Sequence, residues 1–142
     1  MRPIIFLLLM LGLTVWALAL GEAQRRRRHR QARRLAREWE MLFSETDTLA
    51  LAARVASSLP VPGAAEVVVH DLIYGSSGTQ RVYIFSAVYT QGVLGTKRRV
   101  RRVVKVLESS SDMKRPVVTL ADASLAWIEQ YRQVKNGASK IK

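Results

Sequence analysis

The chain has 142 residues, no cysteine and a formal net charge of +12, from 23 Lys and Arg against 11 Asp and Glu. The lack of cysteine excludes a disulfide scaffold, a thiolate metal site and a cysteine nucleophile. Hydrophobic residues make up 49% of the chain, which is more than disordered basic segments contain. We therefore expect one modest folded domain with an appendage.

The N-terminal region contains a long apolar run. Residues 4–20, IIFLLLMLGLTVWALAL, are seventeen residues without a charge. As a helix this run would be about 25 Å long, slightly shorter than the ~30 Å hydrocarbon core of a bilayer. It has no polar face, unlike the buried helix of a soluble protein. We predict that residues 1–21 form a transmembrane anchor.

The charges on either side of the run predict its orientation. Residues 25–37, RRRRHRQARRLAR, carry eight arginines, whereas the N-terminal side offers Arg2 and the α-amine. Positive charge close to a span stays in the cytoplasm, so we expect a retained single-pass anchor in the cell membrane, with the N-terminus outside. The alternative is an exported protein with a cleaved signal peptide, since Arg2 and the small residues near Gly21 suit such a peptide.

A second helical pattern overlaps the arginines. Leu35, Trp39, Leu42 and Phe43 share one face, which predicts a polybasic amphipathic helix over residues 22–43. Arginines four residues apart repel one another, and anionic lipid headgroups next to a span attract such clusters with about 1 kcal/mol per residue. We name as the polybasic collar, and as the expected lipid-binding residues, Arg25, Arg26, Arg27, Arg28, Arg30, Arg33, Arg34 and Arg37. The alternatives are a collar that only sets topology, or one that binds nucleic acid or an acidic protein.

Residues 44–137 predict an α+β domain, followed by a flexible tail over 138–142. A helix is expected at 48–58, strands at 65–74, 81–90, 97–108 and 117–120, and a last helix after a cap at Asp122. Short turns between consecutive strands predict an antiparallel meander. The expected fold is thus a transmembrane helix, further helices, and a three- or four-stranded antiparallel sheet covered by a C-terminal helix.

The strand at 97–108, KRRVRRVVKVLE, has arginines on both faces of its first half. Arg98 and Arg102 share one side with Val100, while Arg99 and Arg101 take the other. Because neither face is apolar there, we expect this end to protrude beyond the packed sheet or to lie at an edge.

No motif carries catalytic chemistry. His70 and Asp71 are neighbours in a strand and point to opposite faces, so they cannot form a dyad, and we expect Asp71 at the surface or in a turn. The serines lie in turn sequences without the strand, elbow and helix of a nucleophile. We expect no enzyme activity, no cofactor and no metal.

An alternative site would bind nucleic acid. Tyr83 and Phe85 have the spacing with which aromatic residues of RNA-recognition sheets stack on bases, and they would be partly exposed if Val82 and Ile84 faced the helices. With the basic strand they give the alternative patch Tyr83, Phe85, Arg98, Arg99, Arg101 and Arg102.

The stretch from Trp39 to Val104 resembles a group of uncharacterised bacterial membrane-anchored proteins. The resemblance is carried by WEMLFSETD, LPVPG, HDLIYG and YIFSAVYTQG. It implies an N-terminal span and a small α+β cytoplasmic domain, and no activity. Together these features predict a membrane-tethered binding or scaffolding domain that contacts anionic lipid and an unidentified protein partner.

Overall fold

The structure is a computed structural model that describes residues 2–59, 61, 63–92, 96–109 and 116–137. The predicted tail at 138–142 lies outside these residues. The chain divides into two compact units, Met1–Gln31 and Ala32–Lys142.

Helix α1 (Arg2–Glu38) carries the apolar run. Its large apolar side chains between Ile4 and Leu20 are 46–70% exposed. The hydroxyl of Thr14 donates a 2.8 Å hydrogen bond to the carbonyl of Met10, so its polar group is satisfied within the helix. In the described part of the chain this is one helix long and apolar enough to cross a membrane, and a signal sequence shares those properties.

The predicted amphipathic helix over 22–43 is wrong at its end. Helix α1 stops at Glu38, and Glu40 has φ 54°, which is incompatible with a continuing helix. Residues Leu42–Ser44 instead form strand β1. Leu42 and Phe43 matched the helical spacing, but β1 pairs with the sheet, and that pairing overrides the local pattern.

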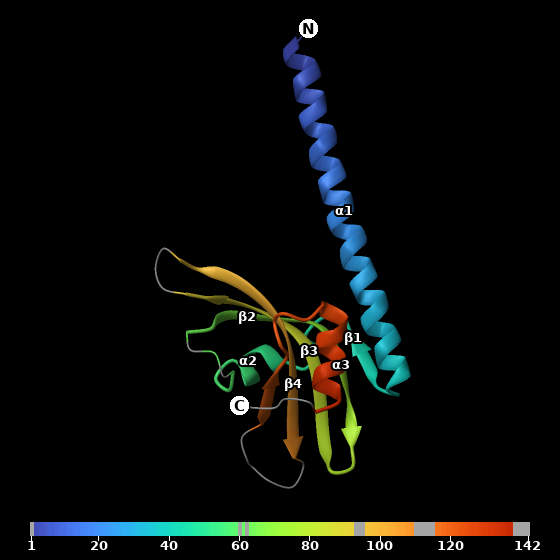
Figure 1. Ribbon diagram of the computed structural model, residues 1–142, viewed down its shortest axis with the longest axis vertical. Coiled ribbons are helices and arrows are strands. Elements are labelled where there is room, and N and C mark those ends of the chain that lie inside the picture. The colour runs from blue at the N-terminus through green and yellow to red at the C-terminus, as the bar shows by residue number, and fades with distance from the viewer. Residues whose placement is uncertain (1, 60, 62, 93–95, 110–115, 138–142) are drawn as a thin grey trace. The chain divides into compact units, whose positions relative to one another are not determined.

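The sheet has five strands in the order β1-β2-β3-β4-β5, with β2 at Ala65–Ser77, β3 at Gln80–Gln91, β4 at Arg98–Ser109 and β5 at Val117–Leu120. Every neighbouring pair is antiparallel. The predicted α+β meander is confirmed (Figure 1). The strand count is one higher than the upper limit of the prediction because β1 was not expected.

Helices cover both faces of the sheet (Figure 1). One face packs Tyr83, Phe85, Ala87 and Tyr89 against α2 (Leu51–Val55). The other packs Val82 and Ile84 against α3 (Trp127–Lys135) and the last turns of α1. Because alternate side chains of β3 enter both clusters, residues 82–89 are all buried. The central strand is therefore the core of the domain.

Both short helices begin later than predicted. The carboxylate of Asp47 accepts hydrogen bonds from the N–H groups of Leu51 and Ala52, at 2.7 and 2.8 Å, so α2 starts at Leu51. Asp122 does not cap α3. It accepts hydrogen bonds from the backbone and hydroxyl of Ser124, and these bonds lower the pKa of its carboxyl.

Asp71 is not a surface residue. It is 4% exposed and has φ 51°, at an irregularity in the pairing of β2 with β3 between His70 and Ile73. Asp tolerates this left-handed conformation better than most residues, which suits a bulge. The sequence prediction failed because it assumed regular alternation through this point.

Candidate functional site

The first five collar arginines belong to the unit Met1–Gln31. At 1.5 Å per residue, Arg25 and Arg30 lie about 8 and 15 Å beyond Leu20 along α1. A bilayer's interfacial layer and one Debye length of ~8 Å extend over this distance from the hydrocarbon boundary. For a hydrocarbon boundary at Leu20, all five arginines therefore lie within the range of electrostatic attraction to lipid phosphates.

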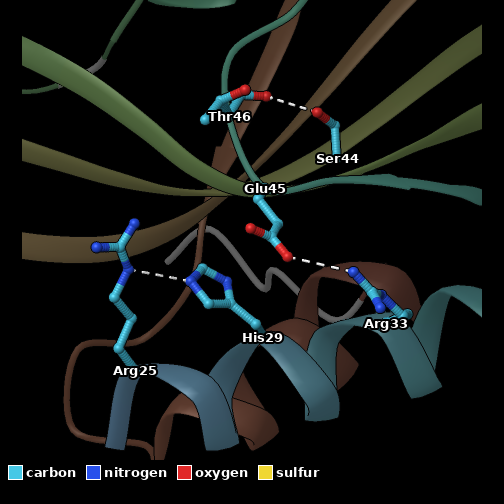
Figure 2. A network of polar contacts seen from close by, with 6 residues as sticks. All are labelled: Arg25, His29, Arg33, Ser44, Glu45 and Thr46. Atoms are coloured by element: carbon cyan, nitrogen blue, oxygen red, sulfur yellow. Dashed lines mark hydrogen bonds and ion pairs between the residues drawn. The ribbon is translucent and has the colours of Figure 1, made fainter. Parts of the chain in front are cut away.

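Among the described residues, each of these arginines either has a partner within the helix or forms no ion pair with a carboxylate. Arg26 pairs with Glu22 at 3.1 Å, with side chains 69% and 51% exposed. The Nε–H of Arg25 donates to Nε2 of His29 at 3.2 Å (Figure 2). Arg27, Arg28 and Arg30 form no ion pair with any carboxylate among the described residues. Their positive charge is therefore available to an external anion.

The last three collar arginines lie in the unit Ala32–Lys142, and two of them have partners there. Arg33 pairs with Glu45 at 3.2 Å (Figure 2). Its guanidinium also lies 5.5 Å from the ring centre of Phe43. Arg34 pairs with Glu38 at 3.2 Å. Arg37 is exposed. The predicted collar is thus divided between the two units, and its first five members belong to the unit that contains the apolar run.

The partner of Arg33 was not found by sequence reasoning. Glu45 follows β1, and the hydroxyl of Ser44 donates to the carbonyl of Thr46 at 2.9 Å, which closes the turn there (Figure 2). The misassigned helix hid this contact. Exposed ion pairs contribute ~1 kcal/mol or less, so this contact orients Arg33 more than it stabilises the domain.

The four arginines of the alternative patch line one hollow. It has a volume of about 530 Å³ and is bordered by Val61, Tyr89, Gln91, Arg98, Arg99, Val100, Arg101, Arg102 and Ala123. Arg98, Arg99 and Arg101 are exposed, and Arg102 is partly buried. Arg102 lies near enough to Asp122 to contribute to its lowered pKa. Arg98, Arg99 and Arg102 form no ion pair within 4.0 Å to a carboxylate among the described residues.

The expected exposure of the patch's aromatic residues is wrong. Tyr83 is 5% exposed and Phe85 is 0% exposed, because their face of β3 packs against α2. The guanidinium of Arg54 also lies 5.9 Å from the ring centre of Tyr83. Tyr83 and Phe85 pair with Val106 and Val104, whereas the arginines lie beside residues 87–91 of β3. The aromatic and basic halves of the predicted patch therefore lie at different places along the sheet.

Among the described residues, histidine and carboxylate side chains do not gather into a metal site, since no group of three or more His, Asp or Glu is placed to hold an ion. The buried Asp71 carbonyl accepts a 2.9 Å hydrogen bond from the Tyr131 hydroxyl, which ties β2 to α3. We interpret this contact as part of the core.

Comparison with protein-family models, with curated proteins and with solved structures finds no match to this chain.

Proposed function

We propose that the chain is a single-pass membrane protein that tethers a small binding domain to the cytoplasmic surface and has no enzymatic activity. The observation that carries the proposal is the exposed apolar run that ends at Leu20, followed between Arg25 and Arg30 by five arginines on the same helix. A span of this composition with basic residues on one side is typical of an anchor that keeps that side in the cytoplasm.

The first half of the collar gives the proposal its lipid component. At about 1 kcal/mol for each basic residue near an anionic surface, five arginines contribute on the order of 5 kcal/mol. Three of them have no described carboxylate to compete with a phosphate. Guanidinium groups match phosphate oxygens in a two-pronged geometry, which favours headgroup contact.

Nucleic-acid binding is the weaker candidate. Stacking on bases needs an exposed aromatic face, and the two aromatic rings in the predicted patch are buried. The arginines of β4 remain, but charge alone attracts any polyanion. The burial of Tyr83 and Phe85 therefore favours a domain that binds a protein over one that binds nucleic acid.

The lipid contact can be tested on the full chain. Because the chain has no cysteine, Gln31→Cys creates a unique labelling position next to the collar. An environment-sensitive dye at this position should shift to the blue in nanodiscs of phosphatidylglycerol but not of phosphatidylcholine. Replacing Arg25, Arg26, Arg27, Arg28 and Arg30 by Gln should abolish the difference.

The matched control removes five charges from the other unit. Gln at Arg81, Lys97, Arg98, Arg99 and Arg132 should leave the lipid-dependent shift intact. A shift that is equal in both lipids would show that the collar only sets topology. A shift lost equally in both variants would show a dependence on total charge, and either result would overturn the proposed headgroup contact.

A further inference from the structure

The arginine hollow lies where the sheet has a short outer strand. Strand β5 pairs with β4 only from Val104 to Leu107, although β4 begins at Arg98. Strand β3, on the other side, pairs with β4 over its whole length (Figure 1). The hollow is bordered by this first half of β4, by Tyr89 and Gln91 of β3, and by Ala123, which follows β5 in the chain.

The backbone direction of this edge follows from Val103. Its N–H donates to Oε1 of Gln130 at 3.2 Å, and its carbonyl accepts from the N–H of Ala121 at 2.9 Å. Both groups therefore point away from β3. In an antiparallel ladder every second residue points the same way, so the N–H and carbonyl of Arg99 also face outward. Arg99 is not bonded to any described strand on that side.

The side chains give this edge its charge. Arg98 and Arg102 lie on the face that carries Ala87, and Arg99 lies on the opposite face. An extended segment that lies beside β4 would have guanidinium groups next to it on both faces of the sheet. The side chains of this segment also alternate between the two faces. Carboxylates at successive positions would therefore pair with Arg98 or Arg102 on one face and with Arg99 on the other.

We propose that an extended, acidic segment of a partner protein adds as a sixth strand to β4 along residues 98–102. Backbone hydrogen bonds to Arg99 fix its register, and carboxylates pair with Arg98, Arg99 and Arg102. Strand addition is a common mode of peptide recognition, with the backbone giving affinity and the side chains giving specificity. The inference deepens the proposed binding function and rests on it for the kind of partner.

The buried aromatic residues favour a peptide over a polynucleotide. Tyr89 borders the hollow but is 1% exposed, so it has no free ring face for a base. The apolar border formed by Val61, Val100 and Ala123 suits the stems of peptide side chains. A peptide strand can also bond to both outward-facing backbone groups of Arg99, the N–H and the carbonyl. A phosphate accepts hydrogen bonds but donates none, so a phosphate chain would leave the carbonyl unbonded.

The test uses the full chain in phosphatidylcholine nanodiscs, where the collar has no anionic lipid to bind. The probe is a short fluorescent peptide of glutamates and valines, compared with the same peptide N-methylated at every amide. We expect the unmethylated peptide to bind at least about tenfold more tightly than its methylated version, which keeps the charge but cannot donate to the β4 backbone.

Substitutions distinguish the contribution of side-chain charge to peptide binding from that of the backbone edge of β4. Replacing Arg98 and Arg102 by Gln should weaken binding about tenfold or more, whereas the control pair Arg81→Gln and Arg132→Gln should change it less than about twofold. Arg99→Gln should weaken binding, and Arg99→Pro should weaken it further. Since the N–H of Arg99 points away from β3, the proline leaves the pairing with β3 intact, which circular dichroism checks.

Several results would overturn the inference. Equal binding of methylated and unmethylated peptides would show attraction by charge alone. Equal losses of peptide affinity in the Arg98/Arg102 variant and in the Arg81/Arg132 control would show that the peptide does not bind at this edge. Tighter binding of a single-stranded oligonucleotide, lost in the Arg98/Arg102 pair, would assign the hollow to nucleic acid. Each of these leaves the lipid response at residue 31 intact, so the inference can fail while the proposed tether stands.

Discussion

The buried hydroxyl of Tyr131 forms a hydrogen bond to the backbone of Asp71, at the irregularity in β2. The ring is fully buried, its hydroxyl donates to the carbonyl of Asp71 at 2.9 Å, and Trp127 meets its edge with centres 4.9 Å apart. Tyr131 lies in α3, the helix that the sequence predicts after Asp122. The sequence did not predict the hydrogen bond, because the carbonyl becomes available only through the bulge in β2.

The first prediction concerns this hydrogen bond. Tyr131→Phe should destabilise the domain by about 1–3 kcal/mol, because it leaves a buried carbonyl without its donor. Thermal unfolding of the full chain in detergent micelles, followed by circular dichroism, measures the loss. Tyr74→Phe is the control, since the Tyr74 hydroxyl makes no hydrogen bond to a described residue. Equal effects of the two substitutions would contradict the prediction.

The same residue predicts an alkaline loss of stability. Burial, and next the negative charge of Asp71, raise the pKa of Tyr131 well above its ordinary value. Above pH ~10 the folded state keeps a proton that the unfolded chain has released, so stability falls as pH rises. Lys105, whose pKa is lowered by burial and by Lys135, acts in the opposite direction up to pH ~10.4.

Comparing variants isolates the contribution of Tyr131. Tyr131→Phe should lose stability less steeply above pH ~10 than the unaltered chain, measured by the same thermal midpoints. The Lys105 contribution is common to both proteins and cancels in the difference. Parallel pH profiles for the two chains would show that the phenol does not ionise differently in the folded state.

At the scale of elements, turn chemistry made the meander predictable. Gly78 and Gly92 have φ of 61° and 127° and close the hairpins that join β2 to β3 and β3 to β4. The alternation in β4 also placed Arg98 and Arg102 opposite Arg99 and Arg101, as the register confirms. Period-2 patterns persist here because the strands are long and their partners are close in sequence.

The errors at this scale have a common cause. Strand β1 depends on pairing with residues that are distant in sequence. The late starts of α2 and α3 depend on such contacts or on a single cap. A local hydrophobic period contains neither kind of information. The burial of Tyr83 and Phe85 depends on α2 covering the face that the sequence left open. The exposure expected for the alternative nucleic-acid patch failed in the same way, since its aromatic half needed an uncovered sheet face.

The cap of α2 supplies the next prediction. Asp47→Ala removes both hydrogen bonds to the start of this five-residue helix and should cost about 1–2 kcal/mol. Amide hydrogen exchange should accelerate over residues 51–59 more than in β3. Asp47→Asn keeps one carbonyl acceptor and should show a smaller change. Unchanged exchange in the Ala variant would mean that the packing of Leu51 and Val55 alone holds α2.

At the scale of the whole molecule, the two units have different charge environments. The first unit joins an uncharged run to five arginines, while the second combines acidic and basic residues and places four arginines of β4 around one hollow. Composition predicted the first arrangement because membrane insertion depends on local hydropathy and charge. The second required the pairing of distant strands, so only the structure shows that the arginines of β4 line a single hollow.

The last prediction is the topology itself. Since no cysteine is present, Arg2→Cys and Asn136→Cys each create a unique thiol for a membrane-impermeant maleimide. In intact expressing cells we expect labelling at residue 2 and, only after permeabilisation, at residue 136, because moving five arginines across a bilayer is far more costly than moving one. Changing the five arginines to Gln should let a fraction of chains invert. Labelling of residue 136 in intact cells, or a mature mass that lacks the apolar run, would instead establish an exported domain, and the collar would then face no cytoplasmic lipid.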